Sequence, residues 1–352
     1  MQPTNSISPR PTSGYAALER NGTIVPWSFE RRAIRDHDVA MDVLFSGVCH
    51  SDIHSVGRWG QEFPIVPGHE IVGRVSGVGG AVTRFKQGDF VAIGTIVDSC
   101  RDCAPCQAEM ETYCQAYPTP TYDGIDRVDG KRTRGGFSDY YVSDERFVHS
   151  VPNGLDLAGV APLLCAGITT YSPLRHWKIG PGKTVGVIGM GGLGHLGVKF
   201  ARAMGAHVVA FTTSPNKVKD ALSLGAHEVV LSSDAAQMQA QAFRFDFLLD
   251  TVSTSYSMNP FMLGLKLDGT LCSLGIPDSF DVMPVMLAMG RRSIASSGAG
   301  GTRETREMLD FCAKHNIVSD VEVIAPSQIN EAFARLEKGD VKYRFVIDMA
   351  RR

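Results

Sequence analysis

A short stretch of the chain concentrates side chains that bind metals or transfer protons. The segment "GVCHSDIH", from Gly47 to His54, places a thiol, two imidazoles, a hydroxyl and a carboxylate within the six positions from Cys49 to His54. One cysteine cannot complete a metal site, because a protein-bound zinc ion takes at least three protein ligands. The stretch therefore raises the question of which distant residues would join Cys49.

A second cluster consists of four regularly spaced cysteines. The segment "CRDCAPCQAEMETYC" has the spacing C-x2-C-x2-C-x7-C, at Cys100, Cys103, Cys106 and Cys114. Four thiolates at this spacing can enclose one tetrahedral Zn²⁺ with no position left for water, so the predicted site is structural. The same cysteines could instead be free or oxidised thiols, or could hold an iron–sulfur cluster. No further cysteine motif supports electron transfer.

Two other residues are candidate partners for Cys49. His69 lies in "VPGHEIVG" and Cys165 in "APLLCAGITTY". A set of Cys, His and Cys with one open coordination position is a pattern of catalytic zinc. Sequence spacing alone does not bring positions 49, 69 and 165 together. Taken singly, Cys165 also fits a small buried hydrophobic residue and His69 a hydrogen-bonded core histidine.

A glycine-rich turn indicates a dinucleotide site. The segment "VIGMGGLGH" carries Gly189, Gly191 and Gly194 as G-x-G-x-x-G, directly after the apolar "TVGVI" and before an amphipathic segment. The first glycine makes the turn, the second lets the backbone approach a pyrophosphate, and the third allows helix and strand to pack closely. We expect Gly192 and Leu193 of the same turn to contact the cofactor. The alternative is a glycine-rich turn without a ligand.

The end of the next apolar segment discriminates between the two nicotinamide cofactors. An acidic residue there would bind the free 2′-hydroxyl of NAD(H) and repel a 2′-phosphate. This chain has "AFTTSPNK" instead, with the hydroxyls of Thr212, Thr213 and Ser214 and the charge of Lys217. Such groups suit a dianionic phosphate, so the sequence favours NADP(H). The alternative is an ordinary turn and helix N-cap.

The surrounding elements must position these residues. Short apolar runs broken by Gly and Asp predict a β-rich region from about residue 14 to 155, and apolar strands alternating with helices predict a parallel sheet after about 156. The fold class is therefore α/β, with expected domains at 1–157 and 158–298 and a return of 299–352 to the first domain. The N-terminal "MQPTNSISPRPTSG" is expected to be a flexible tail without a secretory h-region.

Composition excludes several classes of function. The 352 residues include 43% hydrophobic and 20% charged residues, with a formal net charge of -2. No overall field favours nucleic acid or an anionic membrane surface, and no apolar run of about 18 residues could span a membrane. We expect a cytoplasmic protein, whose eight cysteines stay reduced and free of disulfides.

Several motifs together resemble those of a known family. In their order, "GVCHSD", "GHE", the four-cysteine segment and "GMGGLG" resemble the zinc-containing medium-chain alcohol dehydrogenases over nearly the whole chain. "APLLCAGITTYSPLRHW" and "DVKYRFVID" resemble the cinnamyl-alcohol-dehydrogenase-like branch, in particular its bacterial broad-range NADPH-dependent aldehyde reductases. The resemblance implies a GroES-like β-rich catalytic domain, a Rossmann cofactor domain, two zinc ions per subunit, NADP(H), aldehyde or alcohol substrates and a homodimer.

The resemblance also implies roles for individual residues at a catalytic zinc. Its ligands would be Cys49, His69 and Cys165, with Glu70 as a carboxylate that can approach the metal. Asp52 would hold the His69 ring, as a metal-bound imidazole needs its other N–H fixed, or would cap a turn. Ser51 and His54 would relay a proton from the substrate oxygen through the nicotinamide ribose. Their alternatives are a helix N-cap for Ser51 and an exposed histidine for His54.

Further contacts follow from the same resemblance. His50 and Arg344 would lie near the pyrophosphate, Thr169 would contact the nicotinamide, and Trp59 would form a wall of the substrate pocket. Loops after the later strands would line the nicotinamide and its carboxamide, through Gly275, Ile276, Ser297 and Gly298. The alternatives are surface charges, strand-end turns and a core tryptophan. The segment "QAYPTPTYDGIDRVDGK" differs from the plant enzymes of this branch, so we expect a broad range of aliphatic and aromatic aldehydes.

Two other functions are compatible with these features. One keeps the fold but delivers hydride to a carbon–carbon double bond or an iminium, and such relatives often lose zinc ligands or the relay hydroxyl. The other is a non-catalytic, NADPH-binding zinc protein, in which a proton relay would have no purpose. Cys49, His69, Cys165, Ser51 and His54 are all present, which argues against both.

Overall fold

The computed structural model describes residues 8–351, and the chain divides into two compact units. Unit 1 comprises Met1–Cys165 and Gly301–Arg352, and unit 2 comprises Ala166–Gly300. The sequence predicts boundaries after residues 157 and 298, whereas the first part of unit 1 extends to Cys165 and its second part begins at Gly301. This extension has a chemical consequence, because it keeps Cys165 in the same unit as Cys49 and His69.

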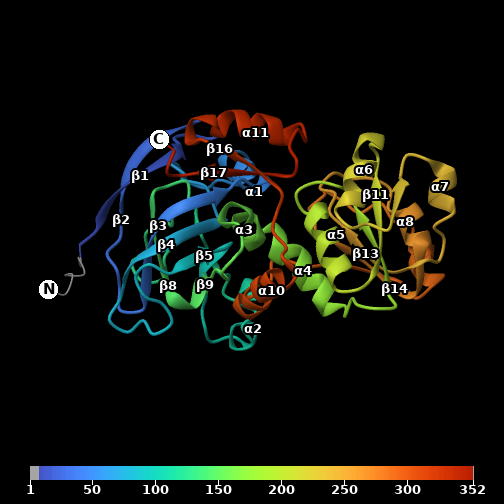
Figure 1. The fold of residues 1–352 in the computed structure, drawn as a ribbon, viewed down its shortest axis with the longest axis horizontal. Helices are drawn as coiled ribbons and strands as arrows, with labels where there is room; N and C mark the ends of the chain where they lie inside the picture. Colours follow the sequence, from blue (N-terminus) through green and yellow to red (C-terminus); the bar gives the residue numbers. More distant parts are fainter. Residues whose placement is uncertain (1–7, 352) are drawn as a thin grey trace. The chain divides into compact units, whose positions relative to one another are not determined.

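Unit 1 is built on a seven-stranded sheet in the order β16-β17-β3-β4-β5-β9, with β8 beside β3 (Figure 1). Two smaller pairs, β1–β2 and β6–β7, accompany it. The strands are β1 (Arg10–Ala17), β2 (Ile24–Arg31), β3 (Asp38–Gly47), β4 (Ile71–Val78), β5 (Phe90–Ile93), β6 (Ile96–Asp98), β7 (Thr119–Pro120), β8 (Tyr140–Asp144), β9 (Val148–Ser150), β16 (Val321–Ile324) and β17 (Arg344–Asp348).

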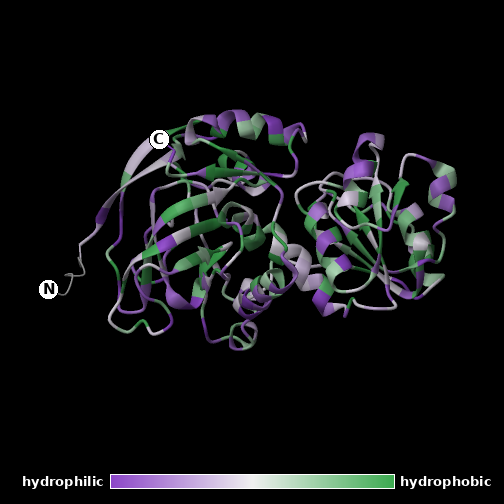
Figure 2. Ribbon diagram, viewed as in Figure 1, coloured by the Kyte–Doolittle hydropathy of each residue, from purple (hydrophilic) through white to green (hydrophobic). Residues whose placement is uncertain are grey.

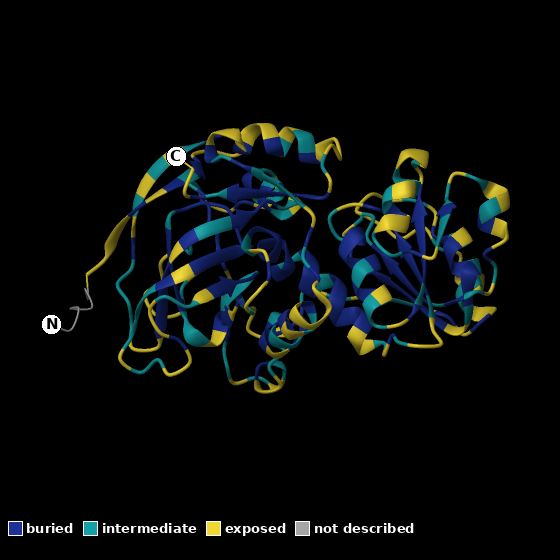
Figure 3. Cartoon of the chain, viewed as in Figure 1, coloured by how far each residue is buried: buried dark blue, intermediate teal, exposed yellow. Residues whose placement is uncertain are grey.

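β3 is the central strand of unit 1, since it pairs with β4, β8 and β17. Its apolar residues Val39 and Met41 are fully buried, as are Ile71 on β4 and Phe345 on β17. Hydrophobic, buried strands therefore form the interior of this unit (Figures 2 and 3). Through β17, which pairs with β3, the C-terminal segment forms part of the sheet of unit 1.

The helices of unit 1 are short except near the C-terminus. They are α1 (His50–Val56), α2 (Ala104–Gln107), α3 (Leu157–Val160), α10 (Thr302–His315) and α11 (Ile329–Glu337), with the 3-10 turns η1 (Glu111–Tyr113), η2 (Glu145–Phe147), η3 (Ala161–Leu164) and η5 (Pro326–Gln328). Asn316 directly follows α10, and its φ of 51° is the left-handed conformation that commonly terminates helices.

The prediction of a flexible tail over residues 1–14 is wrong for its last part. Residues from Arg10 onward form β1, in which Thr12 is buried against β2. The amide of Tyr15 also donates to the carbonyl of Phe137 at 2.8 Å. Ser, Thr and Pro gave no strand signal in the sequence, and pairing with distant segments decided the conformation. Residues 1–7 of the predicted tail lie outside the described residues.

Unit 2 contains one sheet of six parallel strands in the order β12-β11-β10-β13-β14-β15. The strands are β10 (Thr184–Ile188), β11 (His207–Thr212), β12 (Glu228–Leu231), β13 (Phe245–Asp250), β14 (Leu265–Ser273) and β15 (Ser293–Ser296). If the six strands are numbered along the chain, their order is 3-2-1-4-5-6, as in the doubly wound dinucleotide-binding sheet. Successive strands are added toward one edge up to β12 and then toward the other edge from β13, so the strand order reverses between β10 and β13.

Helices cover both faces of the sheet in unit 2, and Figure 1 shows α5 and α8 on opposite sides of it. They are α4 (Ala166–His176), α5 (Gly194–Ala203), α6 (Val218–Ser223), α7 (Ala235–Gln239), α8 (Asn259–Gly264) and α9 (Pro284–Ala288), with the turn η4 (Pro215–Lys217). The inner strands of a parallel sheet covered on both faces must be apolar, and β10, β11 and β13 are accordingly almost entirely buried (Figure 3). The predicted α/β fold class, a β-rich domain plus a doubly wound sheet, is confirmed.

No single helix within residues 8–351 is both long and apolar enough to cross a membrane. The bent pair Leu157–Leu164 and Ala166–His176 meets that test of length and composition only when its two parts are joined.

Candidate metal centres and cofactor site

The predicted catalytic ligands converge within unit 1. One ligand atom from each of Cys49, His69, Glu70 and Cys165 lies within 4.8 Å of the others. The topology explains this, since Cys49 follows β3 and His69 precedes β4, the antiparallel neighbour of β3. The amide of Gly47 donates to the carbonyl of Glu70 at 2.8 Å, which fixes the two strand ends side by side. Cys165 ends η3, which packs on β3.

The buried carboxylate of Asp52 orients this cluster. Its Oδ2 accepts from the amide of Cys49 at 2.8 Å, and its Oδ1 accepts from the amide of Gly68 at 3.0 Å. The same Oδ1 lies 3.3 Å from Nδ1 of His69. Nδ1 therefore donates to Asp52, which leaves Nε2 as the ring nitrogen that can bind a metal in place of its proton. This is the arrangement predicted for Asp52.

The donor set fits a tetrahedral zinc ion. The sulfurs of Cys49 and Cys165 are 4.0 Å apart, and zinc–sulfur bonds of about 2.3 Å in a tetrahedron separate two sulfurs by roughly 3.8 Å. A hydrogen bond with Cys165 lowers the pKa of Cys49 well below its usual value, and the same contact raises that of Cys165. Burial would lower the pKa of His69, but Asp52 holds it well above its ordinary value. Two half-buried cysteines and one buried, oriented imidazole match the Cys, His and Cys set.

Glu70 lies beside the cluster and is fully buried. Its Oε1 accepts from Nη2 of Arg344, whereas its Oε2 has no hydrogen-bond partner among the described residues. Burial raises the pKa of Glu70 to about 7, although Arg344 opposes this. A methyl group on Gly47 would meet Oε2 of Glu70 at 2.0 Å, so only glycine leaves room for this carboxylate. The unpartnered oxygen fits the predicted approach of Glu70 to the metal.

Arg344 was expected at a pyrophosphate, and its contacts within unit 1 were not predicted. Its guanidinium is buried, binds Glu70, and donates to the carbonyl of Val48 at 3.0 Å. The predicted contact with a pyrophosphate stays a prediction. What the structure adds is a counter-charge for Glu70, since an isolated buried carboxylate would be costly.

The predicted proton relay lies on α1. The hydroxyl of Ser51 is 3.7 Å from the sulfur of Cys49, and Cys49 itself occupies the N-cap, so Ser51 does not serve as the helix cap. The rings of His54 and Trp59 have centroids 4.5 Å apart, and those of His50 and His54 lie 6.5 Å apart. Burial lowers the pKa of His54, and the charges of Arg58 and His50 lower it further. This imidazole is therefore neutral near pH 7 and can accept a proton.

One residue next to this site was missed in the sequence. The ring of Tyr122 has its centroid 5.7 Å from that of His69, and its hydroxyl donates to Oγ of Ser55 on α1 at 3.2 Å. Tyr122 is buried and thus covers the imidazole on one side. The available signal was a lone aromatic residue within the otherwise polar "PTPTYDGI", directly after the four-cysteine segment.

The second metal cluster gathers the four regularly spaced cysteines. The sulfurs of Cys100, Cys103, Cys106 and Cys114 lie within 4.8 Å of one another, and none forms a disulfide. Backbone amides donate to three of the sulfurs at 3.4 Å: Cys103 to Cys100, Cys100 to Cys114, and Gln115 to Cys103. Hydrogen bonds from the backbone of Cys103, then Asp102, lower the pKa of Cys100 to about 6. N–H donors stabilise thiolates, which are the metal-binding form.

The glycine-rich turn of unit 2 has the geometry expected of a pyrophosphate cradle. Gly189 has a φ of 90°, which favours glycine, and follows β10 at the reversal point of the sheet. A methyl group on Gly194 would meet the carbonyl oxygen of Gly189 at 1.9 Å, whereas one on Gly191 would meet nothing within 4 Å. Gly194 therefore permits close packing of α5, and open space lies at Gly191, as the motif predicts.

The residues predicted to select NADP(H) gather beside this turn. Nζ of Lys217 donates to the carbonyl of Met190 at 3.1 Å, so a side chain from η4 reaches the glycine-rich turn itself. The amide of Ser214 donates to Oγ1 of Thr212 at 3.1 Å. Thr213 is exposed, and Ser214 is half-buried. No carboxylate stands between residues 210 and 217, so nothing on this segment repels a phosphate.

The remaining predicted cofactor residues lie in unit 2. Gly275 packs so closely on the carbonyl of Val252 that a methyl group would meet it at 1.9 Å. Ile276 is 68% exposed, Thr169 lies half-buried on α4, and Ser297 donates to the carbonyl of Gly298 at 3.1 Å. Asp250 was not predicted from the sequence. Its carboxylate accepts from the amide of Val252 at 3.0 Å and from the hydroxyl of Ser273, and thereby connects the ends of β13 and β14.

Comparison with known proteins agrees with this geometry. Residues 35–153 match the family model "Alcohol dehydrogenase GroES-like domain", and residues 192–314 match "Zinc-binding dehydrogenase". The chain is 52% identical over 328 residues to an aldehyde reductase, YahK, of Escherichia coli, covering 92% of this chain and 94% of that protein. It is 49% identical over 342 residues to an NADP-dependent alcohol dehydrogenase C of Mycolicibacterium smegmatis, covering 96% and 98%.

A solved structure gives the same result. A cinnamyl alcohol dehydrogenase of Sorghum bicolor matches with a TM-score of 0.94 and 44% identity, covering 97% of this chain and 98% of that one. Two family models that together span most of the chain, relatives at about half identity and a solved structure of nearly the same fold all point to one group. The chain belongs to the zinc-containing medium-chain alcohol dehydrogenase family.

Proposed function

We propose that this enzyme is a zinc-dependent, NADP(H)-linked alcohol dehydrogenase that works mainly as an aldehyde reductase. In that direction an aldehyde, NADPH and one proton give an alcohol and NADP⁺. The observation that carries the proposal is the convergence of Cys49, His69 and Cys165 beside the relay hydroxyl of Ser51. Relatives named as an aldehyde reductase and an NADP-dependent alcohol dehydrogenase support it.

Each residue of the site has a defined task in this proposal. Cys49, His69 and Cys165 hold the zinc ion, and Asp52 fixes the ring of His69 so that Nε2 faces the metal. When bound, zinc acts as a Lewis acid on the substrate oxygen, and NADPH provides the hydride. Ser51 passes the proton that the product alcohol requires, and His54 exchanges it with solvent. Trp59, which packs on His54, forms part of the wall around the substrate.

Each predicted cofactor residue also has a defined contact in this proposal. The turn at Gly189, Gly191, Gly192, Leu193 and Gly194 receives the pyrophosphate, and Thr212, Thr213, Ser214 and Lys217 receive the 2′-phosphate. The contacts proposed for His50, Thr169, Gly275, Ile276, Ser297, Gly298 and Arg344 complete the cofactor site. The open space at Gly191 and the reach of Lys217 to this turn support the assignment.

Removing the charge of Lys217 tests the choice of cofactor. Lys217→Ala is expected to raise the Michaelis constant for NADPH by about tenfold or more, because a charge-assisted contact to phosphate contributes about 1.5–3 kcal/mol. The constant for NADH should change little, since NADH has no 2′-phosphate. Lys219→Ala is a matched control on the next turn, as Lys219 is exposed. Equal effects on NADPH and NADH would contradict the phosphate contact.

We also propose two zinc ions per subunit, one at the Cys49 cluster and one at the four cysteines. The second ion has no coordination position left for substrate, so its task is to hold the lobe formed by residues 98–117. The N–H donors to three of the four sulfurs favour a bound metal over free thiols.

The proposed assembly is a homodimer formed through unit 2. β15 pairs with β14 alone, which leaves the other edge of this strand unpaired within the described chain. The segment between β14 and β15 also carries exposed apolar side chains, namely Phe280, Met283, Val285 and Met289. An unpaired strand edge and exposed apolar groups in the segment that precedes this strand favour pairing with a second copy by two-fold symmetry. Sedimentation equilibrium should give the mass of two chains, and the mass of one would contradict the dimer.

The direct test is NADPH oxidation with a panel of aldehydes, enones and cyclic imines. The proposal predicts turnover with aliphatic and aromatic aldehydes and its loss after treatment with a zinc chelator. Preferential turnover of enones or imines would favour the second reaction on this fold, and NADPH binding without any turnover would favour a non-catalytic role.

A further inference from the structure

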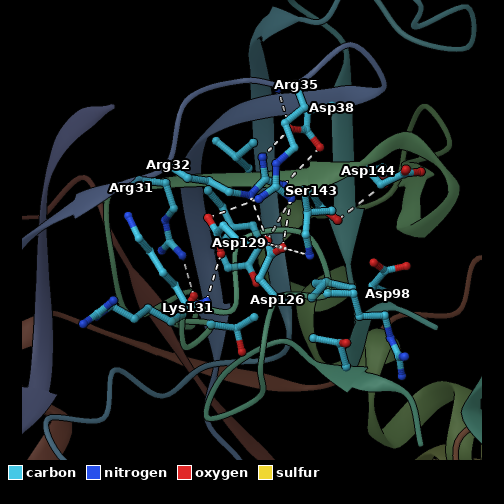
Figure 4. A pocket seen from close by; sticks show the side chains of 18 of the residues that line it. Arg31, Arg32, Arg35, Asp38, Asp98, Asp126, Asp129, Lys131, Ser143 and Asp144 are labelled. Carbon is cyan, nitrogen blue, oxygen red and sulfur yellow. Dashed lines mark hydrogen bonds and ion pairs between the residues drawn. The ribbon is translucent and has the colours of Figure 1, made fainter. Parts of the chain in front are cut away.

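A second chemically distinctive site lies in unit 1, apart from the cluster at Cys49. It is a cavity of about 700 Å³ lined by residues of β2 and β8 and by the loop of residues 126–134 (Figure 4). Charged residues dominate its walls. Neither the proposed reaction nor the cofactor makes use of this cavity.

Part of this cavity is electrically neutralised. Arg32 forms an ion pair with Asp38, and the carboxylate of Asp126 accepts from Arg35 at 2.9 Å and lies 3.3 Å from Nε of Arg32. Arg35 also reaches Asp129 at 3.1 Å. Figure 4 shows these residues as a network in the middle of the view, with Asp98 and Asp144 to the right of it. Cations in this part of the cavity already have their counter-charges.

Four further cations of the cavity form no ion pair with a carboxylate of a described residue: Arg127, which donates to the carbonyls of Ala116 and Tyr117, and Arg31, Lys131 and Arg134. Arg31 is only 7% exposed, and its terminal nitrogens donate to the carbonyls of Arg134 and Gly135 and to Ser138, while its Nε is buried without a partner. The guanidinium of Arg134 makes no hydrogen bond to a described residue, and its Nε is also buried. Figure 4 places Arg31 and Lys131 on the side of the view away from Asp98 and Asp144.

Aromatic rings fix the two guanidinium groups in place. Arg31 lies 4.9 Å from the ring centroid of Phe29 and 4.4 Å from that of Tyr141. Arg134 lies 5.1 Å from Trp27 and 5.4 Å from Phe29. These rings cover the faces of a guanidinium, whose N–H edge is the part that binds phosphate in a fork. The terminal nitrogens of Arg31 already donate to the carbonyls of Arg134 and Gly135 and to Ser138, so the N–H edge open to a ligand is mainly that of Arg134.

A buried cation without a counter-charge is costly, and the pKa of Arg31 reflects this. Burial lowers the pKa of Arg31 to about 10, and the neighbouring Arg134 and Arg32 lower it further, whereas Tyr141 and Tyr140 raise it. The charged groups that act most strongly on Arg31 include no carboxylate. Buried charges in proteins are normally paired, so the missing counter-charge points to a ligand that carries it.

We propose that Arg31, Lys131 and Arg134, which line the same cavity, bind the phosphoryl group of a small phosphorylated molecule. The charge of three cations is matched better by a phosphate dianion than by a ligand with a single carboxylate. The several acceptor oxygens of the phosphate also match the unused N–H groups of Arg134 and the ammonium of Lys131. The aromatic rings of Phe29 and Tyr141 beside them would border the rest of the ligand. This site is independent of the 2′-phosphate contact proposed in unit 2.

The test uses the zinc-loaded enzyme with NADP⁺ at saturating concentration, so that the cofactor site is filled. Inorganic phosphate is the probe, titrated by calorimetry and by thermal unfolding, with sodium chloride at equal ionic strength as reference. The proposal predicts saturable binding of phosphate and a rise of at least about 1 °C in the unfolding midpoint beyond that caused by chloride.

Variants assign the binding to these residues. Arg134→Gln and Lys131→Gln should each weaken phosphate binding by about tenfold or more, because each removes a charged donor. Arg127→Gln is the matched control, since Arg127 lines the same cavity but its guanidinium donates to the carbonyls of Ala116 and Tyr117. Lys131 is exposed, so its variant stays informative if Arg134→Gln does not fold. No phosphate-specific effect in the wild type, or an undiminished effect in Lys131→Gln, would overturn the proposal.

Discussion

The Cys49→Ser variant is expected to lose the catalytic zinc ion and to lower kcat/KM for aldehydes by at least about 10³-fold. A Lewis-acid metal contributes several kcal/mol to stabilising charge on a reacting oxygen, and each 1.36 kcal/mol corresponds to a factor of ten in rate. Serine keeps the size of the side chain but replaces a thiolate that zinc binds well by a hydroxyl with a far higher pKa. The measurement is steady-state NADPH oxidation, together with the zinc content of the same preparation.

A matched control separates metal loss from general damage. Cys312→Ala alters a fully buried cysteine of unit 1 that lies outside both clusters, with its sulfur 3.6 Å from that of Met308. This variant should keep both zinc ions and most of the activity. If Cys49→Ser kept full turnover with one zinc ion fewer, the assignment of the catalytic cluster would be wrong.

The Cys103→Ser variant is expected to lower thermal stability and leave the chemistry intact. Loss of a ligand from a four-cysteine site removes binding energy that also stabilises the fold, so the unfolding midpoint should fall by about 10 °C or more. The lobe also contacts α10, because Glu111 accepts from the amide and hydroxyl of Thr302 at 2.9 Å each. Disorder of the lobe in this variant is therefore expected to destabilise α10 as well.

The control for this variant lies between two of the ligands. Asp102→Ala changes an exposed side chain of the same lobe but retains the backbone amide that faces Cys100. It should lower the midpoint by little, and calorimetric unfolding of the two variants measures the difference. A loss of turnover in correctly folded Cys103→Ser equal to that of Cys49→Ser would contradict a purely structural site.

Much of the fold was predictable because its signals are local. The strand "TVGVI", the glycine-rich turn and the helix after it follow from apolar runs and glycine positions, and the structure has β10, the turn and α5 at those residues. The four-cysteine cluster was equally accessible, since all its ligands lie within one short segment. Such features need no knowledge of how distant segments pack.

The remaining features depend on contacts between distant residues. The sequence alone could not bring Cys165 to Cys49, because that contact depends on η3 packing against β3. The ion pair of Glu70 with Arg344 joins residues that strands β4 and β17 place on either side of β3. The pairing of β1 was missed for the same reason, as its polar residues become a strand only beside β2. In each case tertiary pairing, rather than local propensity, decides the position.

Metal analysis combined with activity tests the central claim most directly. Zinc per subunit and aldehyde-dependent NADPH oxidation are measured on one sample during stepwise removal of metal by a chelator. The account predicts two zinc ions per folded subunit at the start and activity that falls in proportion to loss of the ion held by Cys49, His69 and Cys165. Full activity in a correctly folded subunit that contains fewer than two metal ions would contradict it.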